Sequence, residues 1–464
     1  MTHGSHTHSV SYVSLVSIIA AVAGLLFGFD TGIISGALLF ITKTFPVSTA
    51  MQEAIVGSVL FGAMFGSLCS GKLTDTFGRK RTMLIIASLF IIGTILATLA
   101  GDIAMILLGR IIIGLAIGVG SYTTPLYIAE VAPVQIRGKL VTLNQLAITL
   151  GIFFSYVINY AFIQFDGSWR FMFAIGVIPA ILLALGMFFL PESPRWLVKQ
   201  NKIEKAIRIL QKLRNSNNVL PEIHDIKNTL RTKQASLKQI FSAPILSVLL
   251  LGMMLGLIQQ VTGINTIIYY APTIFQLAGF ESTTSAIVAT IGIGLINVLA
   301  TVFAVFYLDR LGRRPLLFAG LLGMTVSLTG LSLAFYLQLD ITKWLAVGCT
   351  FIYIISFAIS LGAILWLVVS EIFPLQVRAT AMGFAVFSCW FWNFIVSGTF
   401  LTLLANLGPS LTFLLYAVLC VLSLVYCYFF VPETKGITLE EIENNIHKRL
   451  PLREIGQPIY YAVD

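Results

Sequence analysis

The sequence predicts an all-α integral membrane protein with twelve transmembrane helices in two related six-helix bundles. Composition is the first of three observations that predict it: 57% of the 464 residues are hydrophobic and 11% are charged, against about 25% charged residues in soluble domains. So few charged side chains cannot cover the surface of a soluble protein of this length. An ordinary soluble enzyme, a disordered chain and a nucleic-acid-binding protein are therefore excluded.

The second observation is a series of apolar runs, each long enough to cross about 30 Å of hydrocarbon as a helix. The first run, residues 11–41, has no basic segment before it and no small-residue cleavage site after it, so we expect a retained helix rather than a signal peptide. The other expected spans are residues 53–71, 82–100, 103–127, 140–163, 170–190, 245–271, 284–308, 315–338, 343–369, 380–405 and 409–431.

The third observation is an internal repeat, because three motifs occur twice in the same order at offsets of 234 or 241 residues. They are D-x-x-G-R-[KR] in Gly71–Arg81 and Tyr307–Leu317, E-x-x-P-x-x-[VI]-R in Glu130–Arg137 and Glu371–Arg378, and the related PESPR of Pro191–Arg195 and PETKG of Pro432–Gly436. We therefore expect a duplicated six-helix unit. Its parts are an N-terminal tail (1–10), a first bundle (11–190), a linker with amphipathic helices (191–243), a second bundle (244–431) and a C-terminal tail (432–464).

The basic residues predict the orientation in the membrane. Of the 29 Lys and Arg residues, 25 lie in the loops after even-numbered spans or in the C-terminal tail. By the positive-inside rule, both termini are cytoplasmic and the net charge of +9 reports topology rather than an acidic partner. The chain contains no N-x-[ST] sequon, which favours a bacterial protein of the cell (inner) membrane.

The linker and the N-terminal tail carry two minor signals. Residues 198–214 place apolar side chains near one helical face, which predicts an amphipathic helix that either braces the bundle or binds lipid or a calmodulin-type partner. Three His residues among the first eight indicate either a disordered tail or a metal-binding tract. The five Cys residues all lie in apolar spans and form no metal-ligand spacing, so we expect no metal and no cofactor.

Taken together, the paired motifs from Gly24 to Thr438 resemble those of the sugar porters of the major facilitator superfamily. The chain is similar in particular to bacterial proton-linked pentose and hexose symporters and, more distantly, to animal glucose facilitators. The resemblance implies two bundles of nested inverted repeats with a substrate site near the midplane of the membrane. It also implies import of a monosaccharide, a pentose or hexose, by proton symport through alternating access.

Two other functions stay open: a proton-independent facilitator (uniporter), and a non-transporting sugar sensor, which the tail of about 33 residues after Val431 disfavours. An enzyme is not expected, because no span contains His and the chain has no nucleophile elbow and no P-loop. The expected partners are a monosaccharide, protons and the lipid bilayer, with no nucleic acid, and we expect a functional monomer.

Two charges, Asp30 and Arg110, lie deep within expected spans. A charge at the bilayer centre costs at least about 2.5–3.5 kcal/mol, so such residues face a cavity and pair. An opposite charge nearby lowers the pKa of a carboxyl group, and burial raises it. A carboxyl group whose hydration and pairing change between conformational states can therefore bind a proton in one state and release it in another. Related symporters have their proton-coupling aspartate at the position of Asp30. The alternative is a static salt bridge between two helices.

The spans also contain amide and aromatic side chains of the kind that bind a sugar. In QQVTGINTIIYYAP, Gly263 and Pro272 predict a broken helix lining a cavity. The resemblance assigns sugar-binding or neighbouring positions to Gln145, Gln259, Gln260, Asn265, Trp366, Phe27, Tyr269 and Trp390, and we add Asn297 and Asn393 as further candidates. Taken singly, any of these amides could instead join helices by hydrogen bonds.

The sequence departs from the family pattern twice. Gly362 is followed by Ala363 where the family commonly has Pro, so the bend before Trp366 is expected to differ. Cys389 stands where glucose- and xylose-binding relatives usually have Asn or Gln, and a thiol is a weak replacement for an amide. We therefore expect one sugar hydroxyl contact to be lost.

The charged loop motifs are candidates for a cytoplasmic gate. Exposed ion pairs contribute about 0–1 kcal/mol each, so a network that forms in one state biases the conformational equilibrium by a few such increments. The alternative is that these charges only determine topology. The candidate gate residues are Asp75, Arg79, Glu130, Arg137, Glu192 and Arg195 in the first half and Asp309, Arg313, Glu371, Arg378 and Glu433 in the second.

Overall fold

The described part of the chain contains twelve helical segments long and apolar enough to cross a membrane, as the sequence predicts. The computed structural model describes the backbone of residues 3–231, 240–374 and 376–458. Contacts divide the chain into two units. The first unit is Met1–Pro46 with Ser58–Lys233, and the second is Val47–Gly57 with Gln234–Asp464.

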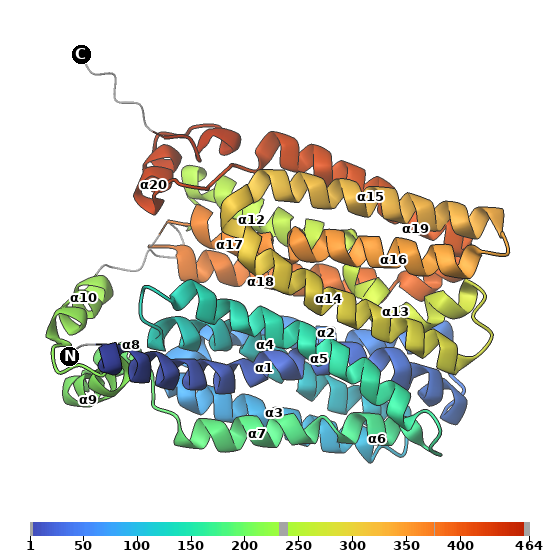
Figure 1. Cartoon of the computed structure of the whole chain (residues 1–464), viewed down its shortest axis with the longest axis horizontal. Coiled ribbons are helices and arrows are strands. Elements are labelled where there is room, and N and C mark those ends of the chain that lie inside the picture. The colour runs from blue at the N-terminus through green and yellow to red at the C-terminus, as the bar shows by residue number, and fades with distance from the viewer. Residues whose placement is uncertain (1–2, 232–239, 375, 459–464) are drawn as a thin grey trace. The chain divides into compact units, whose positions relative to one another are not determined.

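The first unit holds the first group of spanning helices, blue to green in Figure 1. They are α1 (His3–Thr44), α2 (Thr49–Phe77), α3 (Arg79–Thr98), α4 (Ile103–Val131), α5 (Arg137–Phe162) and the consecutive pair α6 (Ser168–Ala174) and α7 (Val177–Phe189). The residues of α2 before Ser58 are grouped with the second unit. Within this unit α1 packs along α5, and α3 packs along α4. The backbone of α1 is helical from His3, so the expected tail of residues 1–10 is mostly part of the first helix. The side chains of that tail lie outside the described residues.

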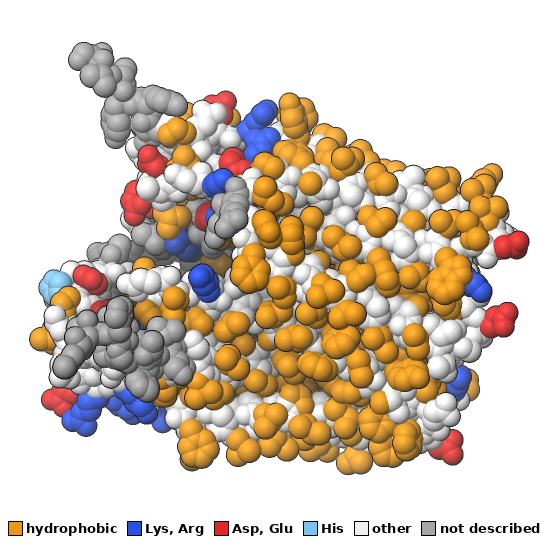
Figure 2. All heavy atoms as spheres, in the orientation of Figure 1, with side chains coloured by type: hydrophobic (Ala, Val, Ile, Leu, Met, Phe, Trp, Pro, Cys, Tyr) orange, Lys and Arg blue, Asp and Glu red, His pale blue; other side chains and the backbone are white. Residues whose placement is uncertain are grey.

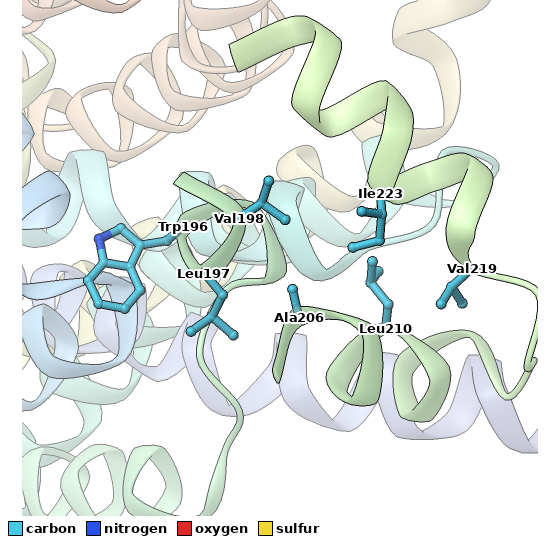
Figure 3. Close-up of a cluster of buried hydrophobic side chains, with 7 residues drawn as sticks. All are labelled: Trp196, Leu197, Val198, Ala206, Leu210, Val219 and Ile223. Carbon is cyan, nitrogen blue, oxygen red and sulfur yellow. The ribbon is translucent and has the colours of Figure 1, made fainter. Parts of the chain in front are cut away.

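Three short helices follow the sixth span and form a small hydrophobic core of their own. They are α8 (Pro194–Lys199), α9 (Ile203–Arg214) and α10 (Leu220–Arg231). Figure 3 shows the buried side chains of this core: Trp196, Leu197, Val198, Ala206, Leu210, Val219 and Ile223. The prediction of a single helix over 198–214 is wrong, because Asn201 adopts a positive φ of 59° and separates α8 from α9. The apolar face of α9 packs inside the linker, which favours a structural brace.

The second unit holds the remaining spans, light green to red in Figure 1. They are the pair α12 (Ala243–Val261) and α13 (Ile264–Leu277), α14 (Thr283–Leu311), α15 (Arg313–Leu337), the pair α16 (Thr342–Ile359) and α17 (Leu361–Ile372), α18 (Arg378–Ser397) and α19 (Phe400–Phe430). The short α20 (Leu439–His447) and a 3-10 turn (Leu452–Glu454) follow. The expected eleventh span, 380–405, is too long, since α18 ends at Ser397 and α19 begins at Phe400.

Three spans of the second unit are interrupted. α12 and α13 are separated at Gly263, whose φ of 91° is accessible to glycine at little cost, and this confirms the predicted break. In the tenth span the break falls at Ser360, where φ is −120° and ψ is −102°, two residues before Gly362. In α19 the chain is kinked at Gly408, with φ of 76°, immediately before a proline that lacks an N–H.

Apolar side chains cover the visible sides of the spanning helices, and charged side chains gather near the helix ends (Figure 2). Large hydrophobic residues that would be unfavourable on a soluble surface are exposed there, including Phe188 at 67% and Phe306 at 71%. Such exposed apolar side chains are expected where helices contact lipid acyl chains rather than water.

Candidate functional site

Two glycines determine which face of α1 packs against α5. A Cβ atom added at Gly28 would overlap the carbonyl oxygen of Ile148, and one added at Gly32 would overlap the hydroxyl of Ser155. The backbones of α1 and α5 therefore approach closely, as small residues allow in membrane helices. Asp30 lies two residues from each glycine and so projects from a different face of α1, on which α4 also packs.

The structure brings Asp30 and Arg110 together, as the sequence predicts. Oδ1 of Asp30 lies 3.4 Å from Nη1 of Arg110, and the two residues are 2% and 0% exposed. The guanidinium also lies 5.9 Å from the ring of Phe173. The second oxygen of Asp30, Oδ2, is buried and has no hydrogen-bond partner among the described residues. The carboxylate is thus only partly neutralised, an arrangement that can accept a proton.

A second charge cluster of the first unit lies where α2, α3 and α4 end or begin. Nε and Nη2 of Arg79 donate to the two oxygens of Glu130 at 2.7 and 2.8 Å. This is the bidentate geometry in which arginine binds a carboxylate most strongly. Asp75 is a more distant partner of Arg79, at 3.5 Å, and also pairs with Lys199 at 2.8 Å.

Glu192, from the motif after the sixth span, caps the start of α3. Its Oε1 accepts the backbone N–H groups of Arg79, Lys80 and Ser193 at 2.9, 3.1 and 2.8 Å. A helix N-terminus leaves such N–H groups without intrahelical partners, and a carboxylate there also opposes the helix dipole favourably. Burial raises the pKa of Glu192, against the lowering effect of these hydrogen bonds. The hydroxyl of Ser193 donates to Glu130 and ties the two carboxylates together.

The second unit repeats this cluster with the predicted offsets. Nη2 of Arg313 donates to Glu371 at 2.9 Å, and the hydroxyl of Thr434 donates to the same carboxylate. Glu433 accepts the backbone N–H groups of Arg313 and Arg314 at 3.1 and 2.9 Å, so it caps α15 as Glu192 caps α3. Duplication therefore extends from the motifs to their hydrogen bonds.

The other gate candidates take less central positions. Arg137 and Arg195 are exposed. Arg378 is half-buried, and its Nε donates to the carbonyl of Phe373 at 3.0 Å; burial lowers the pKa of Arg378. The side chain of Asp309 lies outside the described residues.

In the second unit, the broken helix α12–α13 and α18 form a buried cluster of amides around a thiol. Gln260 Nε2 donates to Oε1 of Gln259 at 3.2 Å and contacts Sγ of Cys389 at 3.0 Å. Asn265 Nδ2 donates to Oε1 of Gln260 at 2.7 Å. Gln259 also donates to the carbonyl of Leu361, at the break of the tenth span. Because the helix is interrupted at Gly263, amides from both of its halves reach one another.

The aromatic and further amide candidates of the second unit lie on α13, α18, α14 and α17. Asn393 Nδ2 contacts the hydroxyl of Tyr269 at 3.4 Å, and Ser397 donates to Oδ1 of Asn393 at 2.9 Å. Trp390 and Asn297 are buried at 6% exposure each. The remaining candidates of the unit are the half-buried Trp366 and the buried Gly362 on α17.

Two sugar-site candidates belong to the first unit. Phe27 on α1 and Gln145 on α5 are both half-buried, and their helices pack along each other. Among the described residues, no group of three or more His, Cys, Asp or Glu side chains could hold a metal ion.

One buried charge, Glu53, was not singled out by sequence reasoning. It is the first residue of the expected second span and is 5% exposed, although most residues around it on the first turn of α2 are exposed or half-buried. Its position at a helix end made it look like an ordinary boundary charge. The partner that buries it lies 349 residues away in the sequence.

Comparison with known proteins identifies the family. A family model described as sugar (and other) transporter matches residues 16–446. A galactose–proton symporter of Escherichia coli K12 is 41% identical over 447 residues, covering 95% of this chain and 96% of that protein. The chain belongs to the sugar transporter family. An arabinose–proton symporter of the same strain is 38% identical over 451 residues, covering 95% of each chain.

Solved structures of xylose transporters share the fold. A xylose transporter from E. coli, in a partially occluded inward-open conformation, matches with a TM-score of 0.83 at 34% identity, covering 92% of this chain and 100% of that one. The predicted major facilitator fold is therefore confirmed. The protein is a multi-pass membrane transporter and not an enzyme.

Proposed function

We propose that this sugar transporter imports a monosaccharide, a pentose or hexose, by proton symport through alternating access. The observation that carries the proposal is the buried Asp30–Arg110 pair, the kind of intramembrane ionisable pair that serves proton relays. The two symporters reported above are named for proton-coupled uptake of galactose and arabinose, which supports the same activity here.

Asp30 is the proton-binding group in this proposal. Protonation neutralises the carboxylate and weakens its attraction to Arg110, which is already only a 3.4 Å contact. The unpartnered Oδ2 is the oxygen that accepts the proton, since Oδ1 faces the guanidinium. A change in this ion pair alters how α1 is held against α4, so proton binding is linked to the arrangement of helices within the first unit.

The amide cluster of α12 and α13 is the main sugar-binding element. Gln259, Gln260 and Asn265 offer amide donors and acceptors at one place, and a sugar hydroxyl can exchange for the hydrogen bonds that these amides make with one another. Half-buried Trp366 offers an apolar surface for the sugar ring. Asn297, Tyr269, Trp390 and Asn393 complete the proposed sugar-binding element of the second unit, and Cys389 limits the hydrogen bonding available next to Gln260. Phe27 and Gln145 are the proposed sugar-binding residues of the first unit.

The cytoplasmic clusters stabilise one arrangement of the helix ends in each unit. Arg79–Glu130 and Arg313–Glu371 are mostly buried ion pairs, so breaking either is costlier than breaking a surface pair. We further propose, from the basic loops, that both termini are cytoplasmic. We also propose that the protein works as a monomer, since one chain contains both copies of the duplicated six-helix unit.

Uptake of radiolabelled sugar into proteoliposomes tests the proposal. An inward proton gradient is expected to drive accumulation above the external concentration, and a panel of pentoses and hexoses competing for uptake identifies the substrate. Equal uptake rates and no accumulation with and without the gradient would leave a facilitator. Absence of sugar uptake in both conditions would leave a sensor.

A further inference from the structure

Glu53 binds the first turn of a helix far away in the sequence. Its Oε1 accepts the backbone N–H of Thr402 at 2.7 Å, and its Oε2 accepts the hydroxyl of the same residue at 2.7 Å. Thr402 is the third residue of α19, so its N–H is one of those that lack an intrahelical acceptor. A buried carboxylate therefore caps α19 and interacts favourably with its dipole.

The capping residue is on a helix shared by the two units. Residues Val47–Gly57 of α2 belong to the second unit, whereas Ser58 onward belongs to the first. One turn after Glu53, a Cβ atom added at Gly57 would come within 3.3 Å of the ring of Phe394 on α18. The start of α2 is thus attached to α19 by two hydrogen bonds to one carboxylate and to α18 by close packing.

The attachment lies on the non-cytoplasmic side in the proposed topology, because α2 and α19 both begin after odd-numbered spans. Alternating access in this kind of fold is largely rigid-body rocking of one bundle against the other. Because α2 continues into the first unit, rocking must bend α2 or separate Glu53 from Thr402. Both hydrogen bonds that Thr402 donates to the Glu53 carboxylate are lost together if the two residues separate.

We propose that Glu53 and the first turn of α19 form a latch that holds the non-cytoplasmic side of the transporter closed, and that opening of that side breaks it. This inference rests on the proposed alternating-access function and adds a gating residue to it. The latch is a charge-assisted cap rather than an ion pair, so it needs no basic partner. It also differs from the cytoplasmic clusters in its helix, because α2 continues beyond Gly57 into the first unit.

Distance measurements between spin labels test the latch in the full-length protein. Labels are attached at Gly101→Cys, where an added Cβ meets nothing within 4 Å, and at Leu339→Cys, which is 48% exposed. Both positions lie in loops on the proposed non-cytoplasmic side. The accessible native thiols are removed by Cys69→Ser and Cys349→Ser, and the other three cysteines are buried. Pulsed electron paramagnetic resonance then reports the long-distance and short-distance populations.

Glu53→Ala is expected to increase the ratio of the open, long-distance population to the closed one by about 100-fold, because two hydrogen bonds to a charged group are lost. Thr402→Val keeps the backbone hydrogen bond and is expected to give about a tenfold increase. Glu53→Gln, which is isosteric and neutral, is expected to lie between them. Glu281→Gln, an exposed carboxylate on the same side, is the control and is expected to change nothing.

Unchanged populations in the folded Glu53→Gln and Thr402→Val proteins would overturn the latch, whatever happens to the Ala variant. Thermal unfolding of each variant separates loss of folding from a shift in populations. The proposed function fails in a different way: a wild-type protein that takes up no sugar would refute transport, while the distance populations still report whether the latch exists.

Discussion

Replacing Asp30 by asparagine removes one charge and almost no volume from the first unit. The carboxylate is 2% exposed and its partner Arg110 is 0% exposed, so the change leaves a cation in a site closed to water. We expect Asp30→Asn to abolish proton-driven accumulation of sugar while leaving exchange of sugar across the membrane. Asparagine cannot bind and release a proton, but its amide oxygen can still accept a hydrogen bond from Arg110.

Two magnitudes follow. A difference of about two pH units is worth about 2.7 kcal/mol per proton, so symport of one proton per sugar supports about 100-fold accumulation, and the variant is expected to reach a ratio of about one. Removing one partner of a buried pair costs about 3–5 kcal/mol of stability. Because asparagine keeps a hydrogen bond to Arg110, we expect Asp30→Asn to lose about 3 kcal/mol of stability, the lower end of this range. A lower unfolding temperature would report this loss.

Proteoliposomes provide the assay, with accumulation measured under an imposed pH difference and counterflow measured without one. Arg110→Gln in the Asp30→Asn background removes the remaining buried positive charge and is expected to recover part of the lost thermal stability, without recovering accumulation. Accumulation near the wild-type ratio in Asp30→Asn would refute the role of Asp30 in coupling. Loss of counterflow together with accumulation, in a stably folded variant, would instead place Asp30 in sugar movement itself.

Three further outcomes are expected. Glu130→Gln and Glu371→Gln each remove the charge of a carboxylate that binds a buried arginine, and the free energy of unfolding should fall by about 1–3 kcal/mol. The loss should be greater for Glu130, whose side chain is 5% exposed, than for Glu371, whose side chain is 18% exposed. Equal losses in thermal unfolding would contradict this difference. Cys389→Asn supplies amide groups beside Gln260 and is expected to change the order in which pentoses and hexoses compete for uptake, whereas an unchanged order would separate Cys389 from the sugar site. Gly32→Leu places side-chain atoms where Ser155 lies, so size-exclusion chromatography should show little folded protein. Gly71→Leu is the control and should fold normally, because a Cβ atom added at Gly71 meets nothing within 4 Å.

The helix count and the duplication could be predicted from the sequence because they depend on local composition and on repeated motifs. The Asp30–Arg110 pair could be predicted because few charged residues lie deep within the apolar spans. A charge in an apolar run must find a partner, and the chain offers one opposite charge at similar depth. The break at Gly263 was predictable for a similar reason, since glycine and proline in one span weaken the helix there.

Contacts between distant segments were less predictable. Asp75 precedes Arg79 by one helical turn and was the natural local partner, but the bidentate partner is Glu130, on another helix. The prediction of a single amphipathic helix was wrong at Asn201, because the spacing of apolar residues does not show that this residue adopts a positive φ. Glu53 escaped notice because its burial depends on Thr402, and no periodic pattern connects those positions.

The coupling of sugar and proton movement is tested most directly by following both in one experiment. Wild-type protein is reconstituted in weakly buffered proteoliposomes with no imposed gradient, and substrate sugar is added outside while an external pH indicator is read. We predict that the external medium becomes more alkaline as sugar enters, and that Asp30→Asn abolishes this change. Sugar entry into wild-type vesicles without a pH change would contradict proton symport.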